Sequence, residues 1–79
     1  MHVNEVEAFA ARVGADKAFA GKRVVIRAPK DKGGLYISRR GRFDAEKKDA
    51  FVYDYERDRV GDQLFQCMSN GMLIEVELA

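Results

Sequence analysis

The chain has 79 residues, the size of one small domain. Apolar residues make up 47% of it and charged residues 34%, which is typical of folded proteins. No apolar run approaches the roughly 20 residues that a membrane-spanning helix needs, and no secretory signal is recognisable. A single cysteine, Cys67, and a single histidine, His2, exclude an internal disulfide and the usual zinc frameworks. We therefore expect one soluble, cytoplasmic domain over residues 1–79, with no metal and no other cofactor.

The net charge of +1 hides an uneven distribution along the chain. Residues 17–48 hold eleven basic and three acidic side chains, whereas residues 49–79 hold two basic and seven acidic ones. Such a chain can present two oppositely charged surfaces to other molecules. The two segments can equally pair with each other and cancel, and the sequence leaves both interpretations open.

The first expected element is a helix over about residues 5–13. Asn4 followed by Glu7 has the spacing of a capping box. An apolar stripe then recurs at helical spacing, formed by Val3, Val6, Phe9, Ala10 and Val13. Gly14 suits the end of this helix, and a short further helical turn is expected at Lys17–Ala20.

Two strands of a hairpin are expected next. Arg23–Ala28 is rich in β-branched side chains, and Pro29 ends its hydrogen-bond ladder. A turn over residues 30–34 leads to a second strand over Leu35–Phe43. Alternation places Leu35 and Ile37 on one face of this strand. The face of the hairpin away from the core would then carry Arg23, Arg27, Tyr36 and Arg40.

A short third strand is expected at Ala50–Tyr53, followed by a helix that Asp54 can cap. Acidic residues in the first turn of this helix would be favourable at the positive end of its dipole. Its apolar stripe is formed by Val60, Leu64, Cys67 and Met68, and Asn70–Gly71 ends it. Residues 72–78 alternate in the manner of a half-buried last strand.

The predicted fold is therefore α+β, a single domain in which two helices lie on a small antiparallel sheet of about four strands. The element order is αβββαβ. One alternative remains, a single long helix over residues 45–69, because several side chains there have helical spacing: Ala50, Tyr53, Arg57, Val60, Leu64 and Cys67. Gly61 and the aromatic and β-branched residues 51–53 favour the strand.

No group of residues points to catalysis. Cys67 lies on the apolar stripe of the expected second helix, and a nucleophilic cysteine would need a base such as histidine nearby. Ser38 and Ser69 have no histidine partner either. Because a function has to be argued from a site, we predict that the protein is not an enzyme.

The strongest candidate for function is the basic segment Ser38–Arg42, because guanidinium groups suit phosphates and carboxylates alike. A charged hairpin edge that merely prevents sheet-to-sheet association is the structural alternative. Tyrosines beside the acidic stretch can be interface anchors or core residues. The residues predicted to contact a partner are Arg27, Lys30, Lys32, Tyr36, Arg39, Arg40, Arg42, Tyr53, Asp54, Tyr55, Glu56, Asp58 and Asp62.

The run from Gly34 to Asp54 resembles a pattern found in small phage and prophage open reading frames. In that pattern a strand ends in an aromatic–Asp turn, here Phe43-Asp44, and leads through a polar link to a short aromatic strand and a capped helix. In size and composition the chain is similar in general character to anti-CRISPR proteins, the small phage inhibitors of bacterial CRISPR–Cas complexes. This resemblance implies a stoichiometric protein binder that blocks DNA recognition or nuclease recruitment.

Three functions follow as expectations. The first is a non-enzymatic interaction protein, of the kind that mobile elements use to inhibit a host CRISPR–Cas or other nucleic-acid-processing complex. The alternative is a small nucleic-acid-binding protein that uses the basic hairpin 22–42 and whose affinity falls steeply with salt. The third is a self-associating protein that pairs through its exposed last strand, and we expect a monomer or a weak homodimer.

Overall fold

The computed structural model describes residues 3–79 of the backbone, with side chains from Glu5 onward. The two helices are α1 (Val3–Phe19) and α2 (Val60–Ser69). The five strands are β1 (Arg23–Arg27), β2 (Tyr36–Ile37), β3 (Phe43–Ala45), β4 (Tyr53–Asp54) and β5 (Glu75–Leu78). Two short 3-10 helices, η1 (Lys30–Lys32) and η2 (Lys47–Asp49), lie in the connections. The predicted α+β class is confirmed, with five strands in place of about four.

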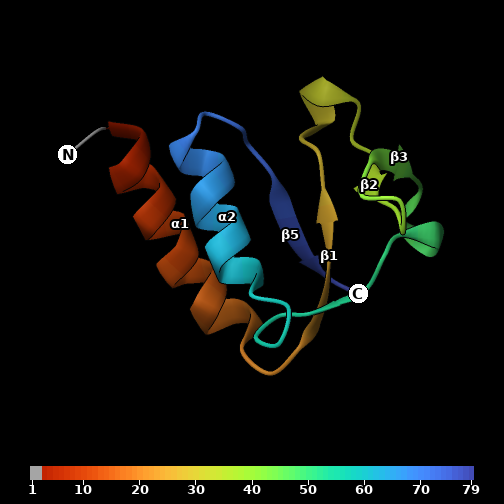
Figure 1. Ribbon diagram of the computed structural model, residues 1–79, viewed down its shortest axis with the longest axis horizontal. Helices are drawn as coiled ribbons and strands as arrows, with labels where there is room; N and C mark the ends of the chain where they lie inside the picture. Colours follow the sequence, from red (N-terminus) through yellow and green to blue (C-terminus); the bar gives the residue numbers. More distant parts are fainter. Residues whose placement is uncertain (1–2) are drawn as a thin grey trace.

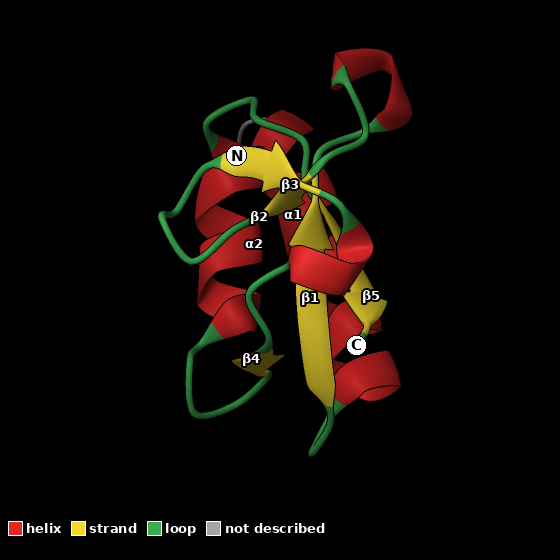
Figure 2. Ribbon diagram, turned by 90° about the vertical axis from the view of Figure 1, so that its right-hand side faces the viewer, coloured by secondary structure: helices red, strands yellow, loops and turns green. Residues whose placement is uncertain are grey.

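Strand β1 is the centre of an antiparallel sheet. It pairs along most of its length with β5, where Val24 lies opposite Leu78 and Arg27 opposite Glu75. On its other side it pairs with β4 at its start and with β2 at its end, and β3 extends the sheet beyond β2. Figure 2 views this sheet from the side away from the helices.

Both helices lie on the same side of the sheet, and in Figure 1 α2 lies between α1 and the strands. The layer between helices and sheet is the hydrophobic core. Its buried members are Ala15, Val24, Ile26, Ile37, Tyr55, Val60, Leu64 and Ile74. The β-branched residues of β1 lie in this layer because alternation along the strand directs Val24 and Ile26 towards the helices.

Helix α1 packs through a different face from the one that its large apolar side chains suggest. Ala8 is fully buried and Ala15 nearly so, whereas the side chains of the predicted stripe are exposed: Val6 is 52%, Phe9 61% and Val13 39% exposed. Alanines recur at the same helical spacing as the stripe, and their small side chains let two helices approach closely. The predicted Asn4 cap and the Val3 side chain lie outside the described side chains.

The predicted break in the first helix is wrong. A single helix runs through Gly14 to Phe19. Glycine inside a helix costs only about 1 kcal/mol relative to alanine, and its neighbours here include several alanines, which favour the helix. Gly21, with a φ of +72°, lies just beyond the helix in the left-handed conformation.

The predicted strand over Leu35–Phe43 is interrupted. The Ser38–Arg42 segment forms a turn in which the Gly41 N–H donates to the Ser38 carbonyl at 2.9 Å, and Gly41 has a φ of +77°. That left-handed conformation is one which glycine adopts at little cost. Of the two apolar residues assigned to one face, Ile37 is buried and Leu35 is 41% exposed.

The second helix begins later than the sequence suggests, and the alternative of one long helix over residues 45–69 is excluded. The sequence predicts a third strand over Ala50–Tyr53, but the strand found there is β4 over Tyr53–Asp54. Helix α2 starts only at Val60, after Arg59 with a φ of +52°. The Asp54 carboxylate accepts the backbone N–H groups of Glu56 and Arg57 at 3.2 and 3.0 Å. Asp54 therefore caps the turn that precedes α2 and not α2 itself.

Tyr55 joins that turn to α1. Its side chain is only 4% exposed, and its hydroxyl donates to the Asp16 carboxylate at 2.6 Å. Burial raises the pKa of Tyr55, and the neighbouring Asp16 raises it further, so the hydroxyl keeps its proton and remains a donor. A Cβ on Gly61 would lie 2.9 Å from the same carboxylate and 3.1 Å from the hydroxyl. A residue larger than glycine at position 61, in the first turn of α2, would therefore clash with the two groups of this hydrogen bond.

We predict that Tyr55→Phe lowers the free energy of unfolding by about 1 kcal/mol, because the ring stays buried and only the hydrogen bond to Asp16 is lost. Tyr53→Phe is the matched control, since the described structure shows no hydrogen bond to the Tyr53 hydroxyl and the ring is half-buried. We expect the control to change stability by less than about 0.5 kcal/mol. Urea denaturation of both variants measures the difference, and equal effects would contradict the role given to the Tyr55 hydroxyl.

Candidate functional site

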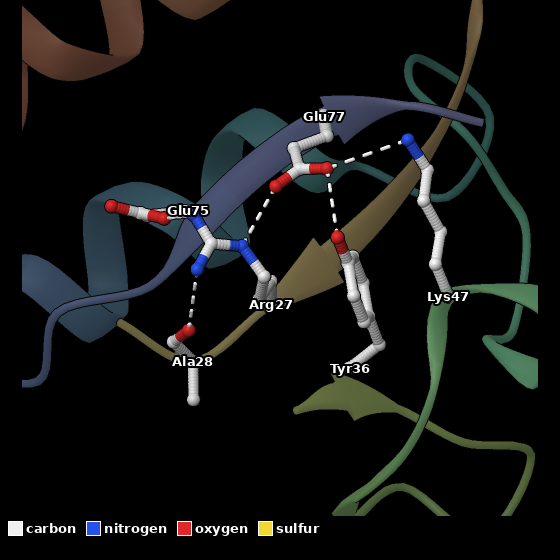
Figure 3. Close-up of polar contacts among 6 residues, drawn as sticks. All are labelled: Arg27, Ala28, Tyr36, Lys47, Glu75 and Glu77. Atoms are coloured by element: carbon white, nitrogen blue, oxygen red, sulfur yellow. Dashed lines mark hydrogen bonds and ion pairs between the residues drawn. The ribbon is translucent and has the colours of Figure 1, made fainter. Parts of the chain in front are cut away.

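Arg27, at the end of β1, is the centre of an ion-pair network on the sheet face away from the helices (Figure 3). Its Nε donates to a Glu77 carboxylate oxygen at 2.7 Å, and its Nη2 pairs with Glu75. Only 14% of the Arg27 side chain is exposed. The two glutamates come from β5, so the network fastens the last strand to the first.

Two further groups converge on the same Glu77 carboxylate (Figure 3). The Tyr36 hydroxyl donates to it at 2.9 Å, and the Lys47 ammonium lies 3.5 Å away. Burial raises the pKa of Glu77, but hydrogen bonds from Arg27 and Tyr36 outweigh that effect and hold it below its ordinary value. Burial, together with Glu77, raises the pKa of Tyr36. Of the predicted contact residues, Arg27 and Tyr36 are thus engaged in internal contacts.

The acidic residues around β4 and α2 are also engaged in internal contacts. The Asp58 carboxylate accepts the Asp54 N–H at 2.8 Å, and Glu56 accepts the Gly21 N–H at 2.6 Å. Asp62 lies 2.6 Å from the Arg12 guanidinium of α1. The backbone N–H of Arg57 holds the pKa of Asp54 below its ordinary value. These carboxylates hold the connection from β4 to α2 and tie it to its neighbours.

The segment Ser38–Arg42, called the arginine turn below, is different because its basic side chains face solvent. Arg39 and Arg42 are exposed, and neither forms an ion pair with a described residue. Arg40 is 75% exposed at its side chain and pairs with Asp44 at 3.1 Å. The Ser38 N–H donates to the Arg42 carbonyl at 2.8 Å, which closes the base of the turn.

An open hollow of about 640 Å³ lies beside the arginine turn. It extends to η2 and is lined by side chains of both charges. The basic ones are Arg39, Arg40 and Lys48, and the acidic ones are Asp44, Glu46 and Asp49. A hydrogen bond with Ser38 holds the pKa of Asp44 below its ordinary value, and Arg40 and Arg42 act in the same direction. The Asp44 carboxylate therefore stays charged and keeps Arg40 at the edge of the hollow.

The other predicted cations do not join this surface. Lys32 of η1 lines a separate, largely apolar hollow of about 430 Å³, formed with Phe43 and the exposed side chains of Met72 and Leu73. Sequence reasoning missed this hollow, because Met72 was assigned to a half-buried strand whereas it lies in the connection before β5. The predicted contact residues thus divide into an exposed turn, a separate 3-10 helix and several internally paired groups.

The other two tyrosines among the predicted contact residues, Tyr53 and Tyr55, lie at the core. Tyr55 is buried, with its ring centroid 5.9 Å from that of Phe19. Tyr53 packs against the core from its half-buried position and lies edge-on to Phe51 at 4.8 Å. Burial raises the pKa of Tyr53, with a further contribution from Asp58.

Within residues 3–79, no group of three or more His, Cys, Asp or Glu side chains is placed to hold a metal ion. None of the described helices has the length and apolar character to cross a membrane. Cys67 is half-buried, and its burial raises the pKa of the thiol, which is the opposite of what an activated nucleophile requires.

We predict that the protein loses stability as the pH falls below about 4.3, the ordinary pKa of glutamate. A carboxyl whose pKa is lower in the folded state stabilises the fold above its unfolded pKa, and this contribution is lost as the pH falls through the folded value. Glu77→Gln should flatten the dependence, because the depressed pKa of Glu77 contributes to it. Denaturation midpoints measured between neutral and acidic pH give the slope.

The control for this experiment is Glu46→Gln. Glu46 is exposed, and its described ion pair is a 3.8 Å contact with Lys48, which is also exposed. An acid dependence as steep in Glu77→Gln as in the control would contradict the part assigned to the Arg27 network.

Comparison with known proteins adds no assignment to this geometry. No protein family model matches the chain, and no curated protein or solved structure does so either. The functional argument therefore rests on the residues of this chain alone.

Proposed function

We propose that the chain is a non-catalytic binding protein whose arginine turn holds an acidic surface of a protein partner. The observation that carries this proposal is the exposure of Arg39 and Arg42 without an ion pair, while most other predicted contact residues are used inside the fold. Unpaired guanidinium groups on a surface are well suited to carboxylates, which they bind with two parallel hydrogen bonds.

The backbone of the arginine turn is organised before a partner arrives. Three hydrogen bonds hold it in one conformation. The Ser38 N–H donates to the Arg42 carbonyl and the Gly41 N–H donates to the Ser38 carbonyl. The Arg40 N–H donates to Ser38 Oγ at 3.3 Å. Ser38 itself is 8% exposed. A loop that is already ordered loses less conformational entropy on binding, so more of the contact energy contributes to affinity.

A protein fits this surface better than a nucleic acid does. The hollow beside the turn carries Asp44, Glu46 and Asp49 among its cations, and this mixture of charges suits a protein surface, which can place basic groups opposite these carboxylates, better than the uniformly anionic backbone of a nucleic acid. Single-strand binding also uses exposed aromatic side chains, on which the bases stack. Here Tyr36 is bonded to Glu77 and Phe43 packs against the core.

The class of partner comes from the resemblance to anti-CRISPR proteins. We propose that the chain inhibits a host nucleic-acid-processing complex and that a CRISPR–Cas complex is the first to test. The small size of the chain and the raised pKa of its one thiol, Cys67, support a stoichiometric blocker over a catalyst.

The test is affinity purification from a bacterial host that carries a CRISPR–Cas system, followed by titration of the recovered partner. We predict that Arg39→Glu combined with Arg42→Glu weakens the interaction at least about tenfold, a loss of about 1.4 kcal/mol. Lys22→Glu is the control, because Lys22 is exposed, shows no described ion pair and precedes the opposite end of β1. Circular dichroism verifies that both variants fold.

A stoichiometric protein partner that binds wild type and control alike and is lost with the double variant supports the proposal. Equal binding by all three chains would remove the arginine turn as the contact surface. Recovery of nucleic acid without protein, with an affinity that falls steeply with salt and is lost in the double variant, would establish the nucleic-acid alternative instead.

A further inference from the structure

The apolar stripe of α1, formed by Val6, Phe9 and Val13, is uncovered in the described part of the chain. Phe9 is 61% exposed, more than any other large hydrophobic side chain described. In Figure 1 α1 lies at the outer side of the molecule, with α2 between it and the strands. Contiguous exposed apolar side chains mark interaction sites in soluble proteins. This surface is independent of the arginine turn, which follows β2 at the other side of the molecule.

We propose that the stripe is the interface of a homodimer in which the α1 helices of two copies pack antiparallel. Val6 and Val13 lie at equal distances along the helix on either side of the midpoint between Phe9 and Ala10. A two-fold axis through that midpoint places Val6 of each copy against Val13 of the other. It also places each Phe9 against an Ala10, a large side chain against a small one. The stripe is thus self-complementary, as a two-fold interface requires.

The charges along α1 favour the same arrangement. Glu5 and Glu7 make the first half of α1 acidic, whereas in the second half the two bases Arg12 and Lys17 outnumber the one acid, Asp16. Antiparallel packing brings the acidic start of one helix towards the basic end of the other. Parallel packing would set acid against acid and base against base, which costs energy. Charge complementarity therefore favours a second copy of α1, packed in the antiparallel direction.

A membrane surface fits this face less well than a second copy does. Helices that lie on membranes carry many Lys and Arg side chains on their polar face, whereas α1 has Glu5, Glu7 and Asp16 against Arg12 and Lys17.

Self-association through the edge strand β5 is disfavoured by Glu75 and Glu77, because charged side chains on an edge strand discourage pairing with another sheet. The helix face is the better surface for a second copy.

The interface is small. Helix α1 has 17 residues, so it is about 25 Å long, and one helix from each copy buries less than a standard protein interface does. We therefore expect a dimer whose population rises with protein concentration. The arginine turns lie away from α1 in each copy and remain free.

Sedimentation velocity from low micromolar to millimolar concentration tests the proposal. We expect Phe9→Glu to raise the dissociation constant of the dimer at least about tenfold. The side chain is exposed, so the fold is retained, which circular dichroism checks. Leu78→Glu, at an exposed position of β5, is the control and should leave the dimer unchanged.

Cysteine pairing tests the direction of packing. A chain with Val6→Cys mixed with one carrying Val13→Cys should form a disulfide-linked heterodimer under mild oxidation, and Val6→Cys alone should not. Wild type measures the background from the half-buried Cys67. A linked dimer from Val6→Cys alone would indicate parallel packing and overturn the arrangement. A wild-type monomer at every concentration, or loss of the dimer in Leu78→Glu but not in Phe9→Glu, would overturn the interface.

Discussion

The central position of β1 is the constraint on which the rest of the structure depends. Three neighbouring strands take their hydrogen bonds from this one segment, β5 on one side and β2 and β4 on the other. Its middle residues Val24, Val25 and Ile26 are 0%, 2% and 0% exposed, so both faces of the strand are buried. Val24 and Ile26 hold the helices, while Val25 faces the side that carries the Arg27 network. This five-residue strand therefore positions β2, β4 and β5 directly, and its buried side chains form part of the core under the helices.

The arrangement of charge explains why a nearly neutral chain keeps an exposed basic turn. The carboxylates after β4 accept backbone N–H groups, and those of β5 pair with Arg27 and Lys47. Most carboxylates in the acidic last part of the sequence are thus engaged in contacts within the fold. Arg39 and Arg42 form no ion pair with a described residue and face solvent. The two interpretations of the charge distribution therefore both apply, each to a different part of the chain.

The elements that could be predicted are those whose signal is local. The β-branched run of β1, the Asn70–Gly71 end of α2 and the alternation of β5 each indicate their structure without knowledge of distant residues. The buried face of α1 could not be predicted, because an alanine stripe and a valine–phenylalanine stripe share one helical period. The choice between them depends on the shape of α2, where Gly61 allows a close approach. The contact surface was predicted in part, since the arginine turn is exposed but Arg27 meets carboxylates 48 and 50 residues away.

The pairing of β1 with β5 has a kinetic consequence. The two strands are joined by almost fifty intervening residues, and the loop must close before the central strand gains its longest partner. Contacts of such long sequence separation slow folding, in contrast to the rapid formation of local helical turns. Until β5 pairs with β1, the backbone groups along one edge of β1 are unpaired, and the valines and the isoleucine of β1 are only partly buried. Folding of this small domain should therefore be cooperative, and the pairing of β5 with β1 is the step that completes the sheet.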